Sequence, residues 1–108
     1  MAYDNQLAER IRPAMVTAGA VEKKMFGGLG FLIQGNMCVG VWKESLIARV
    51  GPDAYESALQ DPNAREFDIT GRAMRGWVMV DCSSLDDAEL GRWLEKSLDF
   101  VLTLPAKS

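Results

Sequence analysis

The apolar residues at the start of the chain recur at helical spacing. The stripe consists of Leu7, Ile11, Met15 and Ala18. This pattern predicts an amphipathic helix over residues 4–18. Pro13 removes a backbone donor and clashes with the preceding turn, so we expect a kink or a restart there. Gly19 is a suitable residue to end the helix.

From residue 21 to residue 50 the period changes to two, which predicts a meander of short antiparallel strands. Gly35-Asn36 is expected to form a two-residue hairpin turn, because both residue types tolerate positive φ. Lys43-Glu44 is a weaker turn signal before a strand over 45–50. Gly51-Pro52 then opens a short helix that ends near residue 60, since proline suits the first helical position.

The last third of the chain predicts one more strand and a long helix. The strand covers residues 74–81, with Trp77 and Met79 on the face opposite to Val78 and Val80. Capping residues follow at Ser83, Ser84, Asp86 and Glu89. The inward stripe of the helix comprises Leu90, Trp93, Leu94, Ser97, Val101 and Leu104. Together these elements predict an α+β fold in two layers: a meander sheet with the three helices packed mainly on one face, in a single domain over residues 1–108.

Counting outward from the two predicted turns assigns each strand residue to a face of the sheet. The face expected to pack on the helices carries Leu32, Gln34, Met37, Val39, Val41, Leu46, Ala48 and Val50. The opposite face carries Phe31, Ile33, Cys38, Gly40, Trp42, Ser45, Ile47 and Arg49, with Phe31 across from Gly40. This second face is more apolar than a solvent-facing sheet normally is.

We therefore expect the second face to bind a partner, most simply a second copy of the chain. The candidate contact residues are Phe31, Ile33, Trp42, Ile47 and Arg49. The alternative is that the last helix, or the segment after Asp61, folds over this face.

Composition limits the chemistry. The 108 residues have a net charge of 12 − 15 = −3 and contain no histidine, which removes the commonest general base and metal ligand. The acidic balance argues against direct nucleic-acid binding, which would show a steep salt dependence. Cys38 and Cys82 have no CxxC spacing, so we expect buried free thiols. No secretory signal or apolar membrane span is visible, and a cytoplasmic location is expected.

Two local strings could bind a small ligand. The glycines of residues 24–31 (KMFGGLGF) could present amides to a phosphate, but the order fits neither common phosphate motif and a strand follows. Bulges or tight connections explain them better. Arg75 and Trp77 could stack a ligand, although packing of a strand tryptophan is the simpler interpretation. The acidic residues after position 80 are expected to be helix caps, and no catalytic or metal-binding set emerges.

These features in this order resemble the N-terminal domain of the TfoX/Sxy family. The resemblance covers residues 4–104 and rests on the opening helix, the KMFGGLGF string, the hairpin through Gly35 and Met37, the strand over 46–50, and residues 74–78 (MRGWV). It implies a two-layer α/β fold without catalytic residues or a cofactor. The motif residues Met25, Phe26, Gly27, Gly28, Gly30, Arg75, Gly76 and Trp77 are expected to be structural.

The namesake members regulate natural competence together with other transcription factors, and they carry a separate C-terminal domain. We expect a single-domain member that lacks the second domain. The sequence thus predicts a non-enzymatic interaction module, a homodimer, that acts through a regulatory protein partner. The alternative is a ligand-binding protein or enzyme that uses residues 27–30 with Arg75 and Trp77; a pocket beside Gly27, Gly28 and Arg75 would favour it.

Overall fold

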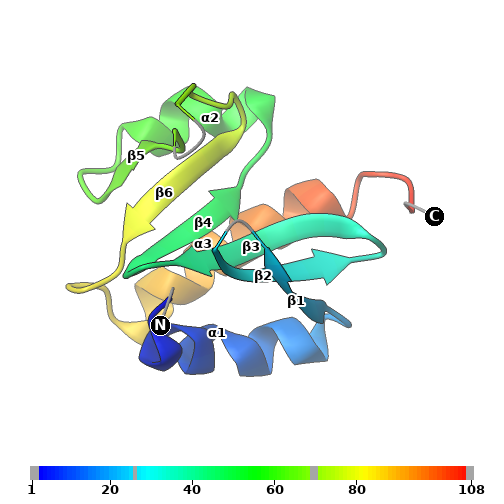
Figure 1. Ribbon diagram of the computed structural model, residues 1–108. Coiled ribbons are helices and arrows are strands. Elements are labelled where there is room, and N and C mark those ends of the chain that lie inside the picture. The colour runs from blue at the N-terminus through cyan, green and yellow to red at the C-terminus, as the bar shows by residue number, and fades with distance from the viewer. Residues whose placement is uncertain (1–2, 26, 69–70, 107–108) are drawn as a thin grey trace.

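The computed structural model describes residues 3–25, 27–68 and 71–106. Within these ranges the chain forms a six-stranded antiparallel sheet with three helices on one face, which confirms the predicted α+β class (Figure 1). The elements are α1 (Asn5–Thr17), β1 (Val21–Met25), β2 (Gly28–Ile33), β3 (Asn36–Trp42), β4 (Ser45–Arg49), α2 (Pro52–Leu59), β5 (Ala64–Glu66), β6 (Trp77–Asp81) and α3 (Asp87–Val101). The strand order is β1-β2-β3-β4-β6-β5.

Local capping chemistry sets the ends of α1. The Asp4 carboxylate accepts from the backbone N–H of Gln6 at 2.8 Å, which satisfies one free donor of the first turn. At the other end Gly19 has φ +86°, and the N–H of Ala20 donates to the carbonyl of Met15 at 2.9 Å, as in a Schellman cap.

The predicted restart of α1 at Pro13 is wrong, because one helix continues through Pro13 to Thr17. Pro13 lies on the exposed side of the helix. The carbonyl that loses its N–H partner at a proline can there be hydrated, which reduces the cost of the missing hydrogen bond.

The two other helices start as predicted. Pro52 is the first residue of α2, directly after Gly51 at φ +88°. At α3, Asp86 and Glu89 form a capping box: the Asp86 carboxylate accepts from the N–H of Glu89 at 2.8 Å, and the Glu89 carboxylate from the N–H of Asp86 at 3.3 Å.

The β2–β3 hairpin turns one residue earlier than predicted. Ile33 pairs with Asn36, so Gln34 and Gly35 form the turn, at φ +51° and +84°. Positive φ at both positions is typical of a type I′ turn. Because a one-residue shift moves every side chain of a strand to the other face, Phe31 and Ile33 lie on the helix side. They are 0% and 4% exposed, and their assignment to the opposite face is wrong.

A β-bulge in β3 limits the effect of this shift. Phe31 pairs with Val39, not with Gly40 as predicted, and Leu32 pairs with Met37, which leaves Cys38 as the extra residue. Cys38 and Val39 both pack in the helix-side core, whereas Met37 lies on the opposite face. The predicted sides of Leu32, Met37 and Cys38 are therefore wrong, and that of Val39 is right.

Burial explains why a glutamine accepts positive φ in this turn. The left-handed conformation costs an L residue about 1–2 kcal/mol. Burying a side chain of the size of phenylalanine or isoleucine contributes about 1.5–3 kcal/mol. Burial of Phe31 and Ile33 together therefore outweighs the strain at Gln34.

The sheet separates two apolar clusters. The larger lies between the sheet and the helices and includes Leu29, Val41, Leu46 and Val80. The smaller lies on the opposite face and has Ile47, Phe67 and Met79 as its buried members. Phe67 follows β5, a three-residue strand that the sequence pattern did not reveal; β5 pairs with β6, and β6 begins at Trp77, not at residue 74.

Candidate interaction surface

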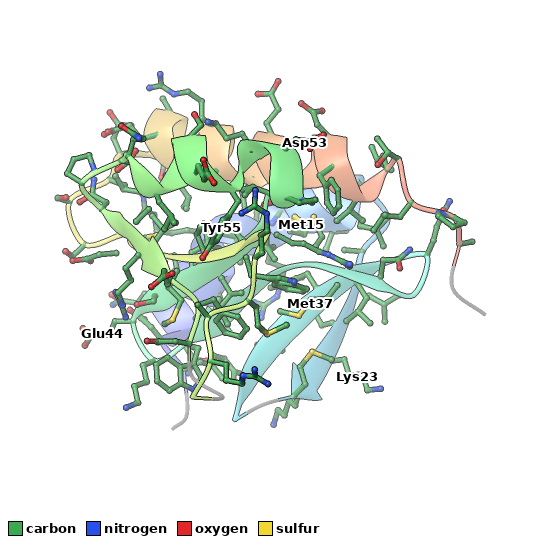
Figure 2. The ribbon with its side chains drawn as sticks, turned by 90° about the horizontal axis from the view of Figure 1, so that it is seen from above. Met15, Lys23, Met37, Glu44, Asp53 and Tyr55 are labelled. Atoms are coloured by element: carbon green, nitrogen blue, oxygen red, sulfur yellow. The ribbon has the colours of Figure 1, made fainter. Side chains whose placement is uncertain are left out.

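We call the side of the sheet that faces away from the helices the outer face. Its central residues are Leu32, Met37, Gly40, Trp42, Ile47, Arg49, Trp77 and Met79. Of the five predicted contact residues, Trp42, Ile47 and Arg49 lie here, and Phe31 and Ile33 do not. Figure 2 shows α2 and α3 together on one side of the sheet, with Lys23 of β1 on the far side.

The centre of the outer face is covered by the chain itself. Phe67, 6% exposed, packs on Ile47 and Met79, and its ring centroid lies 5.9 Å from that of Trp77. The predicted alternative, in which the segment after Asp61 covers this face, is thus correct for its centre. Around that cover Leu32, Met37, Trp42 and Trp77 remain partly exposed.

Two cations lie against aromatic rings at opposite ends of the outer face. Lys43 Nζ is 4.6 Å from the ring centroid of Trp42, and Arg49 Cζ is 4.9 Å from that of Trp77. Burial lowers the pKa of Arg49, whose guanidinium nevertheless stays charged at neutral pH. Four residues of β4 separate these ends, which corresponds to about 13 Å of extended strand.

The cations of the outer face differ from those of α1. Both arginines of α1 form salt bridges to neighbouring elements, at 3.1 and 2.9 Å. Among the described residues, Lys23, Lys43 and Arg49 form none. Arg49 donates to the carbonyl of Met37, at 3.4 Å. The outer face therefore combines partly exposed apolar side chains with positive charges that no described carboxylate neutralises.

The glycine string has a structural role at the β1–β2 connection. Gly27 takes φ +77° between the two strands. A Cβ at Gly30 would lie 2.7 Å from Sδ of Met25, so the methionine side chain occupies the space that the glycine leaves. Gly28 is buried at the start of β2. Phe26, also part of the predicted motif, lies outside the described residues.

Arg75, Gly76 and Trp77 also serve local packing. Arg75 pairs with Glu56 at 3.5 Å, while Trp77 packs on Phe67 and Arg49. The carbonyl of Gly76 accepts from the backbone of residues 50 and 51, and φ is +96°. A Cβ at Gly76 would lie 3.2 Å from the backbone of residue 51, which favours glycine there.

The structure does not bring the glycine string and Arg75 together. Leu29 pairs with Val41, so the string lies at the end of the sheet that carries Trp42. Trp77 pairs with Arg49 at the other end, three strand positions away from β2. The composite ligand site that the sequence suggested as an alternative is therefore not assembled.

Comparison with known families gives one match. A model of the TfoX N-terminal domain family matches residues 15–101, from the end of α1 through the last residue of α3. The chain belongs to the TfoX N-terminal domain family. A comparison with curated proteins finds no significant match.

The two motif strings are part of the matched segment of this TfoX N-terminal domain. Gly27 and Gly76 have positive φ, and a Cβ at Gly30 or Gly76 would meet a close neighbour.

Neither of two surface hollows is lined by the central residues of the outer face or by Gly27, Gly28 or Arg75. One lies between α2 and α3, and the other beside Asp4, Arg10 and Cys82. In the described part of the chain no three His, Cys, Asp or Glu side chains gather at one metal-binding position. None of its helices combines the length and the apolar character that crossing a membrane requires.

Proposed function

We propose that this TfoX N-terminal domain is a non-enzymatic interaction module that binds a protein partner through the outer face, most simply a second copy of itself. The observation that carries the proposal is the coexistence there of partly exposed Trp42, Met37 and Trp77 with cations that lack described carboxylate partners. Aromatic residues, Met and Arg are enriched in protein interfaces.

A two-fold contact between two outer faces fits the charges. The outer face also carries Asp81, which alternates with Met79 on β6, and Glu44 lies beside Lys43 in the β3–β4 turn. Cations of one copy can therefore meet carboxylates of the other around an apolar centre. Such electrostatic complementarity directs orientation more than it adds affinity.

A protein fits this face better than a nucleic acid does. Single-stranded nucleic acid binds where bases can stack on free aromatic faces within a positive groove. Here Lys43 and Arg49 already lie over the rings of Trp42 and Trp77, and the chain is acidic overall. Absence of binding to double-stranded or single-stranded nucleic acid at low salt would agree with this argument.

The family supports a regulatory role. Its namesake members act in competence regulation together with other transcription factors, and we extend that role to this chain as a module that recruits or holds a protein partner. The free cysteines Cys38 and Cys82 fit a reducing, cytoplasmic compartment.

Light scattering across a concentration series tests self-association. The wild type should gain mass with concentration, and Trp42→Asp should stay monomeric, because a charge that replaces an apolar contact residue of an interface is costly to desolvate. Lys43→Glu, at an exposed position, provides a second variant that does not disturb the core. Val16→Asp is the matched control, since Val16 is a 60% exposed apolar residue on α1.

Affinity capture from native lysate tests a different partner. Wild type and the folded Trp42→Asp variant are compared, with folding checked by circular dichroism. A partner that contacts the outer face should be recovered by the wild type and by Val16→Asp only. Equal recovery by all three proteins, together with a concentration-independent monomer mass, would disprove the proposed surface.

A further inference from the structure

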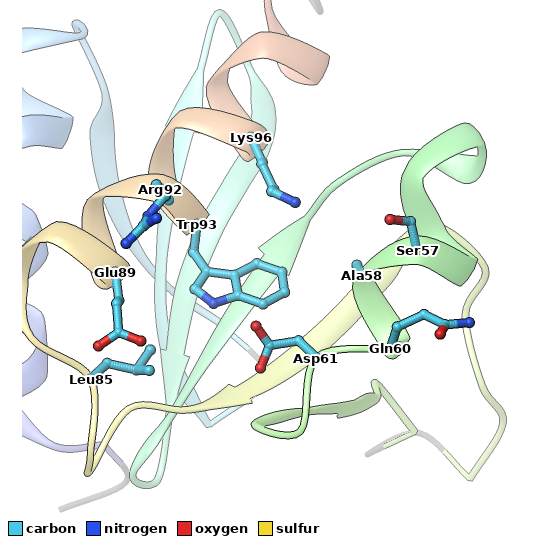
Figure 3. Close-up of a pocket in the computed structure, with 9 residues that line it drawn as sticks. All are labelled: Ser57, Ala58, Gln60, Asp61, Leu85, Glu89, Arg92, Trp93 and Lys96. Carbon is cyan, nitrogen blue, oxygen red and sulfur yellow. The ribbon is translucent and has the colours of Figure 1, made fainter.

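The helix side of the molecule contains a pocket that the interaction role does not use. α2 packs over β5 and β6, while α3 packs over β3 and β4, and the pocket lies between these two helices. The pocket has a volume of about 410 Å³. Its walls are the last turn of α2 with Asp61, the first turns of α3, and Leu85 (Figure 3). This volume is at the small end of the range of ligand sites.

Four charged side chains line this inter-helix pocket, and their charges sum to zero. They are Arg92 and Lys96, one turn apart on α3, and Asp61 and Glu89. None of them forms a salt bridge within the described part of the chain. The pocket therefore offers an anion site and a cation site at the same time.

The two carboxylates are held in place by backbone donors. One oxygen of Asp61 accepts from the N–H of Asn63 at 2.8 Å, and one oxygen of Glu89 accepts from the N–H of Asp86 at 3.3 Å. The second oxygen of each carboxylate has no donor among the described residues. Fixed acceptors of this kind lose little freedom when a ligand binds, which favours affinity.

Trp93 adds a donor without a protein acceptor. The residue is 5% exposed and its indole N–H donates to no described residue, but the nitrogen atom itself is not cut off from solvent. In Figure 3 the indole nitrogen faces the part of the pocket where Leu85 and Glu89 lie, and Lys96 Nζ is 5.6 Å from the ring centroid. The indole N–H can therefore donate to water or to an oxygen of a bound ligand.

We propose that the inter-helix pocket binds a small zwitterion of the amino-acid class. The carboxylate of the ligand pairs with Arg92 and Lys96, its ammonium group pairs with the free oxygens of Asp61 and Glu89, and an oxygen of the ligand accepts from the Trp93 indole. The four lining charges sum to zero and include both signs, which favours a zwitterion over a simple anion. The small volume of the pocket favours an amino acid over a nucleotide. The site is separate from the outer face and independent of the proposed partner.

Indole N–H signals in ¹H–¹⁵N spectra test the proposal. The chain has three tryptophans, and Trp93→Phe identifies which signal belongs to Trp93. The protein amino acids are added one at a time to millimolar concentration. At least one should shift the Trp93 signal saturably. Two blocked derivatives of that amino acid serve as controls: the C-terminal amide lacks the carboxylate charge, and the N-acetyl derivative lacks the ammonium group. Each should bind at least about tenfold more weakly.

Charge-removing variants then locate the site. Asp61→Asn keeps an acceptor for Asn63 and removes the charge, and Lys96→Gln removes a cation; each should weaken binding about tenfold. Lys24→Gln, a similar change on β1, should leave it unchanged. Absence of a saturable shift with every amino acid would overturn the proposal. So would equal binding of the blocked derivatives, or equal binding by Lys96→Gln and Lys24→Gln.

Discussion

Gly51 occupies a position where a side chain has neither space nor a suitable backbone conformation. It has φ +88°, and a Cβ there would collide with the ring of Phe100. With ψ 160°, this backbone lies in a region that is essentially restricted to glycine. We expect Gly51→Ala to lower the free energy of unfolding by about 2–6 kcal/mol, from backbone strain of about 1–3 and overpacking of about 1–3. Urea denaturation measures the loss. Gly19→Ala, at φ +86° with no neighbour within 4 Å, should lose only the strain. Equal losses would contradict the role of Phe100.

Burial makes both thiols poor acids. It raises the pKa of Cys38 to about 12 and that of Cys82 to about 11, against 9.0 for an ordinary thiol. The pKa of each thiol is higher in the folded protein than in the unfolded protein. The contribution of the thiols to stability is therefore complete below about pH 9, and it is lost as the pH rises toward 11–12. Below pH 9 both thiols should react with a disulfide reagent much more slowly in the folded protein than in urea.

The control for the thiols is the double variant Cys38→Ala and Cys82→Ala. Its melting temperature should fall less steeply between pH 9 and pH 11 than that of the wild type. If the melting temperature of the double variant falls as steeply as that of the wild type, groups other than the thiols cause the loss of stability at alkaline pH.

At the scale of elements, α3 contains a glycine that its surroundings do not require. Gly91 lies inside the helix, and a Cβ would meet nothing within 4 Å. Gly91→Ala should therefore raise the free energy of unfolding by about 0.5–1 kcal/mol, because alanine loses less backbone entropy in a helix. The reverse change at exposed Ala88, Ala88→Gly, should cost a similar amount. Thermal denaturation of both variants checks this, and a destabilised Gly91→Ala would refute it.

The β2–β3 turn contains strain that another residue can relieve. Gln34 has φ +51° directly before Gly35, a position where type I′ turns favour asparagine. We expect Gln34→Asn to stabilise the protein by about 0.5–1 kcal/mol, because asparagine tolerates the left-handed region. Gln60→Asn, at a helix end with φ −72°, is the control that should show no gain. Equal effects in urea denaturation would contradict the turn geometry.

The elements that the sequence predicted well are those specified by neighbours along the chain. The cap of Asp86 and Glu89 and the stripe of α3 need only residues a few positions apart. The β2–β3 register depends on residues far apart in the sequence. A turn of Gln34 and Gly35 becomes favourable only because Phe31 is buried under helices that are distant in sequence. The short strand β5 has too few residues to show a period.

The same distinction applies to the candidate surfaces. Trp42, Ile47 and Arg49 were assigned to the outer face correctly, because the turn at residues 43–44 that fixes their sides was predicted correctly. The cover by Phe67 could not be specified, since it depends on where the segment after β5 returns to the sheet. The inter-helix pocket likewise arises from the placement of α2 relative to α3.

For the molecule as a whole, apolar clusters on both sides of one sheet imply two units of different stability. The helix-side core involves α1, α3 and the central strands, whereas the outer cluster depends on Phe67 from a segment with little regular structure. Such segments open at lower free energy than the core does. Opening the outer cluster would expose Ile47 and Met79 and enlarge the apolar area of the outer face.

Phe67→Ala tests this separation. We expect it to lower the free energy of unfolding by about 3 kcal/mol, because a buried phenylalanine leaves a cavity. Hydrogen exchange should accelerate most in residues 64–68 and 71–76, while α1 and α3 keep their relative protection. Met37→Ala, at the partly buried rim of the same cluster, should show a smaller loss. The exposed Ile47 and Met79 should also increase self-association in light scattering. Uniform acceleration across all elements would show that the two clusters unfold as one unit.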